Sequence, residues 1–408
     1  MTPSCRFCNG ELAHELVDLG VSPLSNAYLR AEDLARMEPF YPLVAYVCGR
    51  CFLVQLPAME TPERIFTDYA YFSSYSDTWL AHARDSCAAM TARFGLDGGS
   101  FVVEIASNDG YLLRNFVAAG IPSLGIEPAA NIAHVARERG IDTEVAFFGR
   151  DTAARLAGER RKADLLLGNN VLAHVPDLND FVAGLQVLLA PDGVVAMEFP
   201  HLLELIVHNQ FDTIYHEHFS YFSMFTVRQV FAAHGLEIFD VDRLPTHGGS
   251  LRIYAAHAGR RTVDERVTSL EAEERARGLD RLETYERFGE EVQETKRVLL
   301  DFLIRAKEER KRIAAYGAPA KGNTLLNYCG IRTDFIDYTV DRSPYKQGLF
   351  LPGSHIPIHA PQRILETKPD YVLILPWNLR EEIAGQMSGI REWGGRFVIP
   401  IPRVAVLH

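Results

Sequence analysis

Two CxxC pairs near the start of the chain constrain its folding more than any other feature. Cys5 and Cys8 lie in "SCRFCNG", and Cys48 and Cys51 lie in "VCGRC". Each CxxC turn can aim two thiolates at one ion, and two such turns complete a tetrahedral Zn²⁺ site with no open position. In a reducing compartment this spacing favours a metal over disulfides. We therefore predict a zinc module over residues 1–75, with a structural and not a catalytic role.

The remaining chain is long enough for further domains, because 408 residues exceed what one hydrophobic core usually organises. A helical pattern runs from Trp79 to Phe94, and strand-like and helix-like segments then alternate through "FVVEIASNDGYLL", "PSLGIEP" and "VVAMEFP". Such alternation predicts a mostly parallel sheet covered by helices on both faces. We assign residues 76–262 to this α/β domain.

A second α/β unit follows a charged connector. The Glu-, Arg- and Leu-rich segment from about Val263 to Lys311 favours one or two long, solvated helices with one buried stripe. "RIAAYGAPAKGNTLLNY" and "DYVLILPW" then resume the alternation. Residues 263–408 are therefore predicted to form the connector and a second Rossmann-like domain, so that the fold class is α/β with an N-terminal zinc module.

The overall charge and hydropathy exclude several classes of partner. A net charge of −11 argues against sequence-independent nucleic-acid binding, which needs a basic surface. No apolar run approaches the roughly 20 residues needed to span a bilayer, and "MTPSCRFCNG" lacks the apolar stretch of a signal peptide. We expect a cytoplasmic protein without a membrane partner. The sequence contains no long heptad array, so we also expect a monomer.

The first strand of the central unit leads into a turn suited to a nucleoside-containing cofactor. Glu104 ends this strand and Gly110 opens a helix, and such ligands lie at this edge of an α/β sheet. Glu127 ends the next strand, where a carboxylate can accept bonds from both ribose hydroxyls. Ala106 and Asn108 occupy positions where glycines are frequent. Because a pyrophosphate needs close backbone approach through glycines, the turn disfavours NAD and suits S-adenosylmethionine (AdoMet), which has no phosphate.

This arrangement resembles the class I AdoMet-dependent methyltransferases over roughly residues 80–200. The resemblance implies a cradle in which Glu127 holds the ribose and four residues border the methionine part of AdoMet: Glu104, Ala106, Asn108 and Gly110. It also implies that Phe147 or Phe148 flanks the adenine, and that Asn169 or Asn170 closes the end of the fourth strand.

The segment "YHEHFSYF" gathers groups that can move or orient a proton. Methyl transfer to carbon needs a carbanion equivalent, formed by removing a proton next to a carbonyl, and a histidine suits that task. His174, in "NVLAHVPD", follows a cofactor-binding strand at the point where a substrate would approach. We therefore predict a catalytic role for at least one histidine.

Taken together, the motifs resemble those of a family along nearly the whole chain. The double CxxC module precedes an AdoMet fold with "YHEHFSYFS", then "HGGSLRIY", then "YGAPAKGNTLLNY". This order resembles the three-domain sugar C-methyltransferases of antibiotic deoxysugar pathways, the C-3′-methyltransferases of the D-tetronitrose type in particular. The resemblance implies a dTDP-4-keto-deoxysugar as substrate. Carbon 3 lies next to the C4 ketone, so an enolate formed there would attack the AdoMet methyl group.

The resemblance also assigns roles around the reacting carbon. It implies that His218 is the base, that Glu217 and Tyr215 position or polarise the enolate, and that His174 lines the same pocket. A tyrosine of "DYAYFSSYS", Tyr69 or Tyr71, would reach the substrate from the N-terminal module. In an extended run side chains alternate between two faces. His218 would then lie on the face opposite Tyr215 and Glu217, and His216 would also point away from those two residues. The run must therefore turn if the three residues share one site.

The C-terminal unit is expected to hold the nucleotide part of the substrate. Its lysine precedes the second glycine of the turn, so the motif is not a P-loop. The resemblance implies two sets of substrate contacts: Gly317, Lys321, Asn323, Thr324 and Asp341 around the dTDP portion, and His247, Gly248, Gly249, Ser250 and Arg252 facing the sugar and its phosphate.

Three alternatives remain open at this point. Methylation could occur at carbon 5, which also adjoins the C4 ketone, and residue types do not separate the two positions. Read alone, the C-terminal unit could bind NAD and make the protein a dinucleotide-dependent oxidoreductase. A non-enzymatic zinc-finger binding module is disfavoured by the acidic balance.

Overall fold

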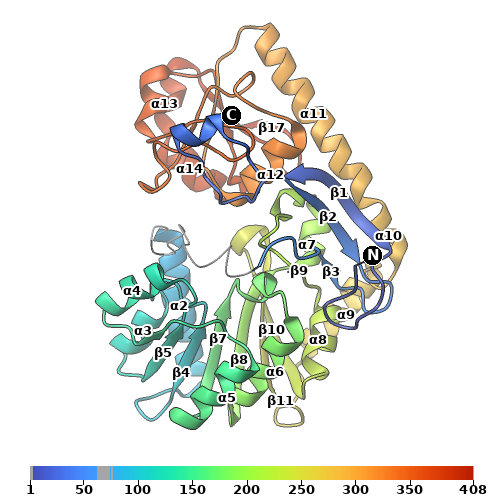
Figure 1. Ribbon diagram of the computed structural model, residues 1–408, viewed down its shortest axis with the longest axis vertical. Helices are drawn as coiled ribbons and strands as arrows, with labels where there is room; N and C mark the ends of the chain where they lie inside the picture. The colour runs from blue at the N-terminus through green and yellow to red at the C-terminus, as the bar shows by residue number, and fades with distance from the viewer. Residues whose placement is uncertain (1–2, 62–73, 75–76, 408) are drawn as a thin grey trace.

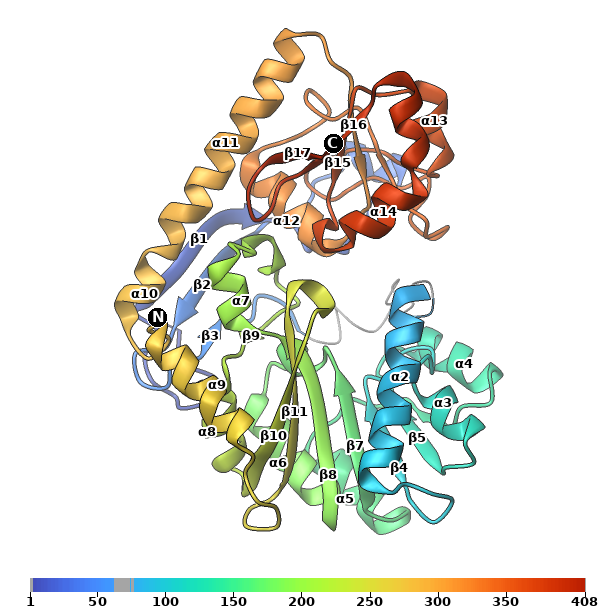
Figure 2. The ribbon, with the colours of Figure 1, turned by 180° about the vertical axis from the view of Figure 1, so that it is seen from behind.

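The computed structural model describes residues 3–61, 74 and 77–407, which contain three sheets (Figures 1 and 2). The N-terminal sheet is antiparallel, in the order β1-β2-β3-β9. Its elements are β1 (His14–Ser22), the 3₁₀ turn η1 (Ala31–Ala35), β2 (Tyr41–Val47), β3 (Val54–Gln55) and β9 (Ser220–Tyr221). Because β9 comes from the middle of the chain, the central domain completes the sheet of the zinc module.

The central sheet has seven strands in the order β10-β11-β8-β7-β4-β5-β6. Its strands are β4 (Val102–Ile105), β5 (Ser123–Ile126), β6 (Thr143–Glu144), β7 (Ala163–Asn169), β8 (Leu189–Pro200), β10 (Leu236–Leu244) and β11 (Ser250–His257). The strands from β6 to β8 are parallel, whereas β10 and β11 are antiparallel. The chain moves to one side of β4 and then returns to β7, so the carboxyl ends of these two strands border the crevice where α/β sheets bind ligands.

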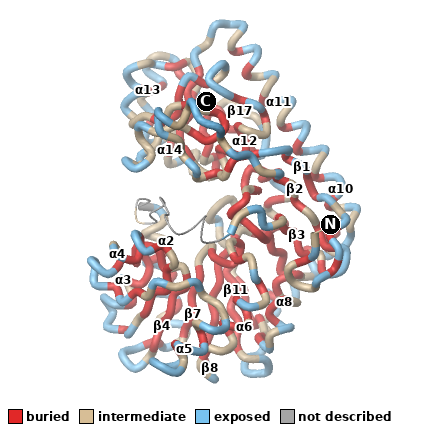
Figure 3. The backbone as a smooth tube through the Cα atoms, in the orientation of Figure 1, coloured by how far each residue is buried: buried red, intermediate tan, exposed pale blue. Residues whose placement is uncertain are grey.

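Helices cover both faces of this sheet. They are α2 (Asp77–Phe94), α3 (Leu113–Ala118), α4 (Ala130–Glu138), α5 (Arg150–Glu159), α6 (Leu178–Leu188), α7 (Leu202–Val207) and α8 (Met224–Ala232), with 3₁₀ turns η3 (Leu172–His174), η4 (Phe211–Thr213) and η5 (Thr246–Gly248). Alternate residues of β4 point to opposite faces. Val103 and Ile105 therefore join the core under α5, α6 and α8, while Val102 joins the core under α2 and α3. The buried strands are visible as red segments in Figure 3.

Three helices form the connector: α9 (Glu265–Ala276), α10 (Leu282–Glu286) and α11 (Phe288–Glu308). The expected buried stripe is present on α11, where Phe288, Val292, Leu299 and Leu303 recur at helical spacing and are fully buried. These residues share one core with β1 and with the C-terminal domain. The connector therefore joins the first and last parts of the chain, as Figure 2 shows for α11 beside β1.

The C-terminal sheet has the order β14-β13-β12-β15-β16-β17, parallel except for β17. Its strands are β12 (Ile313–Tyr316), β13 (Thr339–Val340), β14 (Ile358–His359), β15 (Tyr371–Ile374), β16 (Arg396–Ile399) and β17 (Ala405–Leu407). Its helices are α12 (Ala320–Cys329), α13 (Gln362–Thr367), α14 (Arg380–Gln386) and the 3₁₀ turns η6 (Trp377–Leu379) and η7 (Ser388–Trp393). The predicted fold class, two Rossmann-like units behind a zinc module, is confirmed. Among the described residues, no helix is both long and apolar enough to cross a membrane.

Candidate active site and zinc centre

The predicted zinc ligands converge at one point. The Sγ atoms of Cys5, Cys8, Cys48 and Cys51 all lie within 4.8 Å of one another, and all four cysteines are free thiols. This donor set fits a closed tetrahedral zinc site. The amide of Gln55 donates to the Cys5 sulfur at 3.1 Å. Such a hydrogen bond orients a thiolate ligand toward its metal. No position is left open for substrate, which agrees with a structural role.

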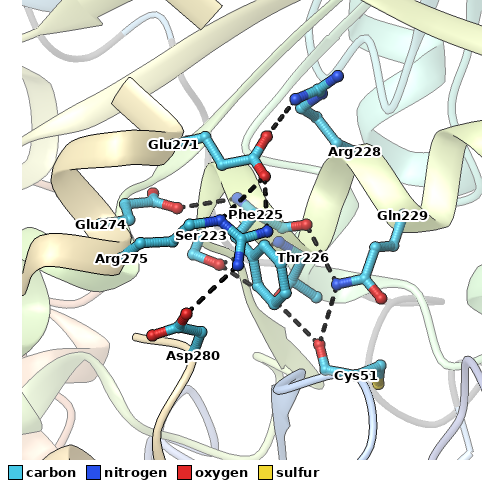
Figure 4. Close-up of polar contacts among 10 residues, drawn as sticks. All are labelled: Cys51, Ser223, Phe225, Thr226, Arg228, Gln229, Glu271, Glu274, Arg275 and Asp280. Atoms are coloured by element: carbon cyan, nitrogen blue, oxygen red, sulfur yellow. Dashed lines mark hydrogen bonds and ion pairs between the residues drawn. The ribbon is translucent and has the colours of Figure 1, made fainter. Parts of the chain in front are cut away.

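The segment that carries Cys48 and Cys51, which we call the zinc loop, contacts the central domain at α8 (Figure 4). The Cys51 carbonyl accepts hydrogen bonds from the Thr226 hydroxyl and the Gln229 amide. The fully buried Glu274 of α9 accepts from the backbone N–H groups of Met224 and Phe225 at 2.7 and 2.8 Å. Because this carboxylate caps the first turn of α8, it holds the helix that carries the contacts to the zinc loop.

The turn after β4 has the backbone that a cofactor cradle requires. Ala106, Asn108 and Gly110 all adopt left-handed conformations, with φ of 55°, 50° and 76°. Two of these positions are not glycine, as the sequence indicated, and asparagine tolerates this region better than alanine does. Glu127 fixes the turn, because its two carboxylate oxygens accept from the N–H groups of Asn108 and Ala129, each at 2.9 Å.

The cradle is electrostatically prepared for a cation. Burial raises the pKa of Glu104 well above its usual range, and the nearby charges of Glu127 and Asp109 raise it further. Several buried atoms at the ends of β4 and β7 have no partner among the described residues: Oε2 of Glu104, Nδ2 of Asn169 and Oδ1 of Asn170. Such orphaned groups need a polar ligand. They fit the ammonium and carboxylate of the methionine part of AdoMet.

The expected adenine neighbours differ in their surroundings. The Phe147 side chain is 41% exposed, whereas the Phe148 ring packs edge-on against Phe181 with centroids 5.3 Å apart. Asn170 has a left-handed backbone, and its side-chain nitrogen lies 3.0 Å from Nε2 of His247. The contact of either phenylalanine with adenine stays a prediction.

The segment that follows η4 turns as the shared-site hypothesis required. A turn at His216 and Glu217 brings the His218 N–H to the Tyr215 carbonyl at 2.8 Å. The Tyr215 hydroxyl consequently lies 2.8 Å from Nε2 of His218. Nε2 of His216 contacts the carbonyl of Pro42 at 3.1 Å. We call residues 212–218 the histidine turn.

Backbone carbonyls determine the protonation of both site histidines. Nδ1 of His218 lies 2.9 Å from the Thr213 oxygen, and Nδ1 of His174 lies 2.7 Å from the Glu217 oxygen. Because a carbonyl only accepts, each Nδ1 carries the proton and each Nε2 has a lone pair. Burial lowers the pKa of His174 to about 4 and holds the pKa of His218 well below its usual range. Both rings are therefore neutral at pH 7, with centroids 4.7 Å apart.

Glu217 has a partner that the sequence did not reveal. The Asn26 amide donates to its carboxylate at 2.9 Å, and burial raises the pKa of Glu217 to about 7. The same loop reaches the C-terminal domain, since Tyr28 donates to the Ala318 carbonyl at 2.6 Å. Asn26 stands in the polar loop "PLSNAY", which gave no periodicity or motif to predict a place in the site.

The "HGGSLR" motif lies beside the cofactor crevice, and its polar side chains are bonded within the protein. His247 packs against Trp79 with ring centroids 5.1 Å apart. The φ angles of Gly248 and Gly249 are 95° and 118°, which glycine alone adopts readily. Ser250 donates to the Thr246 carbonyl at 2.9 Å.

Arg252 has a carboxylate partner within the sheet. Its guanidinium is buried and pairs with Glu198, its direct neighbour across β11 and β8, with an Nη2–Oε2 distance of 2.5 Å. His82 of α2 contacts the same carboxylate at 2.9 Å. The contact of Arg252 with the sugar phosphate stays a prediction.

Residues of the C-terminal turn mostly brace the domains against each other. Gly317 has a φ of 91°, which no other residue type adopts readily. The Asn323 amide donates to the Ser25 carbonyl at 2.6 Å, and the Thr324 hydroxyl to the Ile214 carbonyl at 3.0 Å. The Asp341 carboxylate accepts from the Ala318 N–H at 2.8 Å. These side chains therefore have partners within the protein, and their expected contacts with dTDP stay a prediction.

A cavity of about 740 Å³ opens between the central and C-terminal domains. Its lining includes Gln210 and Gly248 from the first, and Trp377, Asn378 and Arg380 from the second. The Trp377 indole donates to the Asp212 carboxylate at 2.7 Å, which places the cavity against the histidine turn. Tyr69 and Tyr71, the tyrosines expected to reach the substrate, lie outside the described residues.

Comparisons with known proteins agree with this geometry. Three family models match in succession: a putative zinc binding domain over residues 5–66, a methyltransferase domain over 79–241, and a C-methyltransferase C-terminal domain over 245–402. The C-methyltransferase NovU of Streptomyces niveus is 38% identical over 99% of this chain and 96% of its own length.

More distant relatives match only part of the chain. A ubiquinone biosynthesis O-methyltransferase of Chelativorans sp. is 28% identical over 28% of this chain and 48% of its own length. A solved magnesium protoporphyrin IX methyltransferase of Synechocystis with bound SAH covers 48% of this chain and 92% of its own, with 18% identity and a TM-score of 0.36. The family models and the full-length match to NovU show that the chain belongs to the AdoMet-dependent C-methyltransferases that carry an N-terminal zinc-binding domain.

Proposed function

We propose that this enzyme methylates carbon 3 of a dTDP-linked 4-keto-deoxysugar through an enolate formed in the histidine turn. The observation that carries the proposal is the pair of buried, neutral imidazoles whose Nε2 lone pairs are set by carbonyl contacts at Nδ1. A neutral imidazole can accept a proton, and a carbon next to a ketone is acidic enough to lose one to a positioned base. AdoMet, bound in the Glu104–Glu127 cradle, would supply the methyl group.

The arrangement assigns a distinct task to each residue. Nε2 of His218 is the proton acceptor, and the Tyr215 hydroxyl, which now donates to that nitrogen at 2.8 Å, is positioned to turn toward the substrate oxygen when the sugar binds. His174 packs against His218 and limits its rotation. Glu217, held by Asn26, is positioned by geometry to contact a sugar hydroxyl. The interdomain cavity is large enough for the sugar and its diphosphate.

The cysteines support a proposal about the compartment in which the enzyme works. Four reduced cysteines arranged for a metal are typical of a reducing compartment, so we propose that the enzyme works in the cytoplasm. A role in antibiotic deoxysugar biosynthesis rests on the resemblance of the motifs along the chain.

The test is a mass-spectrometric assay in heavy water with dTDP-4-keto-2,6-dideoxyhexose and AdoMet. We expect gain of one methyl group together with deuterium exchange beside the ketone, and NMR of the product should place the methyl on carbon 3. Methylation at carbon 5 would correct the position and retain the mechanism. The His218→Asn variant should lose both exchange and transfer while its calorimetric affinity for AdoMet stays within about twofold of wild type. Exchange that persisted in this variant would rule out His218 as the base.

A further inference from the structure

Lys321 carries a half-buried ammonium whose direct contacts are an amide and an aromatic ring. It lies in the first turn of α12, and its Nζ donates to the Asn378 side-chain oxygen at 2.9 Å. The same nitrogen lies 4.4 Å from the ring centre of Trp377. Burial lowers the pKa of Lys321, and the charge of the buried Asp212 raises it. An ammonium whose direct contacts are an amide and an aromatic face can still bind an anion of the substrate.

The helix directs this ammonium toward the histidine turn. Lys321 and Thr324 are three residues apart and share one face of α12. The Thr324 hydroxyl is bonded to Ile214, immediately before Tyr215. Trp377, on whose ring the ammonium rests, donates to Asp212. The positive charge of Lys321 also contributes to the lowered pKa of His218 and His247. These contacts place Lys321 beside the base.

The surrounding charge distribution disfavours a diphosphate at this position. The loop that leads into α12 already binds an anion of the protein, because the Asp341 carboxylate accepts from the Ala318 N–H at 2.8 Å. Asp212, which accepts from the Trp377 indole, adds a second carboxylate, and it is buried. A doubly charged diphosphate would be repelled by both, whereas a single oxygen atom can approach Lys321 alone.

We propose that Lys321 is a catalytic residue that stabilises the enolate oxygen of the substrate. The inference rests on the proposed function and deepens it. When the C3–H bond breaks, the proton passes to Nε2 of His218, and the electron pair forms the C3=C4 bond and leaves a negative charge on the C4 oxygen. The Lys321 ammonium lies on the side of the histidine turn where it can bind that oxygen. Its charge is fixed before the reaction, as transition-state stabilisation requires.

The test separates an enolate contact from a phosphate contact. Hydrogen–deuterium exchange at carbon 3 is followed by mass spectrometry at saturating dTDP-4-keto-2,6-dideoxyhexose, and binding of dTDP alone is measured by calorimetry. For Lys321→Met we expect an exchange rate and kcat roughly 10²–10³-fold lower, the usual loss for one oxyanion-stabilising group, with the Kd for dTDP unchanged. Lys307→Met is the matched control, because that lysine pairs with Asp337 on the surface at 3.5 Å.

A second variant offsets the charge without removing the lysine. Asn378→Asp places a carboxylate where the amide now contacts Nζ at 2.9 Å, so it should pair with the ammonium and lower the exchange rate as Lys321→Met does. Lys321→Arg, which keeps the charge, should retain part of the wild-type rate. Weaker dTDP binding with an unchanged exchange rate in Lys321→Met would overturn the proposal in favour of a diphosphate contact. Unchanged exchange and unchanged binding would overturn it as well. If the wild-type enzyme itself showed no exchange, the proposed function would fail, and this inference with it.

Discussion

Replacing Glu127 tests the cofactor cradle most directly, because this carboxylate performs two tasks. Its oxygens accept from the N–H groups of Asn108 and Ala129 at 2.9 Å each, and both bonds are buried. The same carboxylate is expected to accept from both ribose hydroxyls. A hydrogen bond to a charged group contributes about 1.5–3 kcal/mol, so losing the two ribose bonds would cost about 3–6 kcal/mol of binding free energy if nothing replaced them. Because water can enter the open crevice of the variant and replace part of these bonds, we expect a loss of about 3 kcal/mol in the free energy of AdoMet binding. This value corresponds to AdoMet binding that is roughly 100-fold weaker.

The assay is isothermal titration calorimetry of AdoMet with the Glu127→Ala and Glu127→Gln variants. The glutamine variant keeps the shape and one acceptor oxygen, so its loss of affinity should be intermediate. Glu138→Ala is the matched control, because that glutamate lies on the surface of α4, where it pairs with the exposed His134. An affinity of Glu127→Ala within about threefold of wild type, at an unchanged melting temperature, would show that the ribose is held elsewhere.

The remaining predictions concern protons, metal and stability. The protein should release protons when AdoMet binds, because burial raises the pKa of Glu104 and a bound cation lowers it again. The affinity for AdoMet should therefore rise with pH. Identical binding enthalpies in buffers of different ionisation enthalpy would contradict this proton release. Cys48→Ser should release zinc and lower the melting temperature, and a zinc-free variant as stable as wild type would refute the structural role. Glu274→Ala leaves two N–H groups of α8 uncapped and also removes the buried partner of His201 at 2.6 Å, so it should cost at least about 2–6 kcal/mol in urea denaturation. Glu273→Ala, which removes an exposed pair with Arg243, should cost less than about 1 kcal/mol. Equal losses in the two variants would refute the capping role of Glu274.

Features that depend on local sequence could be predicted well. The alternation of strands and helices indicated both α/β units because hydrophobic periodicity is a property of neighbouring residues. The cradle was recognisable even with Ala106 and Asn108 in place of glycines, since the spacing from Glu104 to Gly110 defines the turn. The turn inside "YHEHFS" could be stated only as a condition, because alternation along an extended strand separates Tyr215 from His218.

Features that depend on distant pairing could not be predicted. Asn26 meets Glu217 across 191 residues, and Trp377 meets Asp212 across 165. No periodicity connects such positions. Strand β9 contains only two residues, which is too short to give a pattern of its own. The pairing of Arg252 with Glu198 could not be predicted for the same reason, because the neighbour of Arg252 across the sheet is set by the register between β11 and β8.

Residues of every domain contact the histidine turn, and this arrangement limits how domains can be exchanged between such enzymes. The strand that follows it, β9, is paired with β3 of the zinc module, and the start of the turn is bonded to Trp377 and Thr324 of the C-terminal domain. A chimera that takes its C-terminal domain from a relative would therefore replace two of the residues that hold the histidine turn. Functional chimeras should need a junction that transfers residues 211–221 together with that domain, so new substrates are more readily reached by changing the lining of the cavity than by exchanging whole domains.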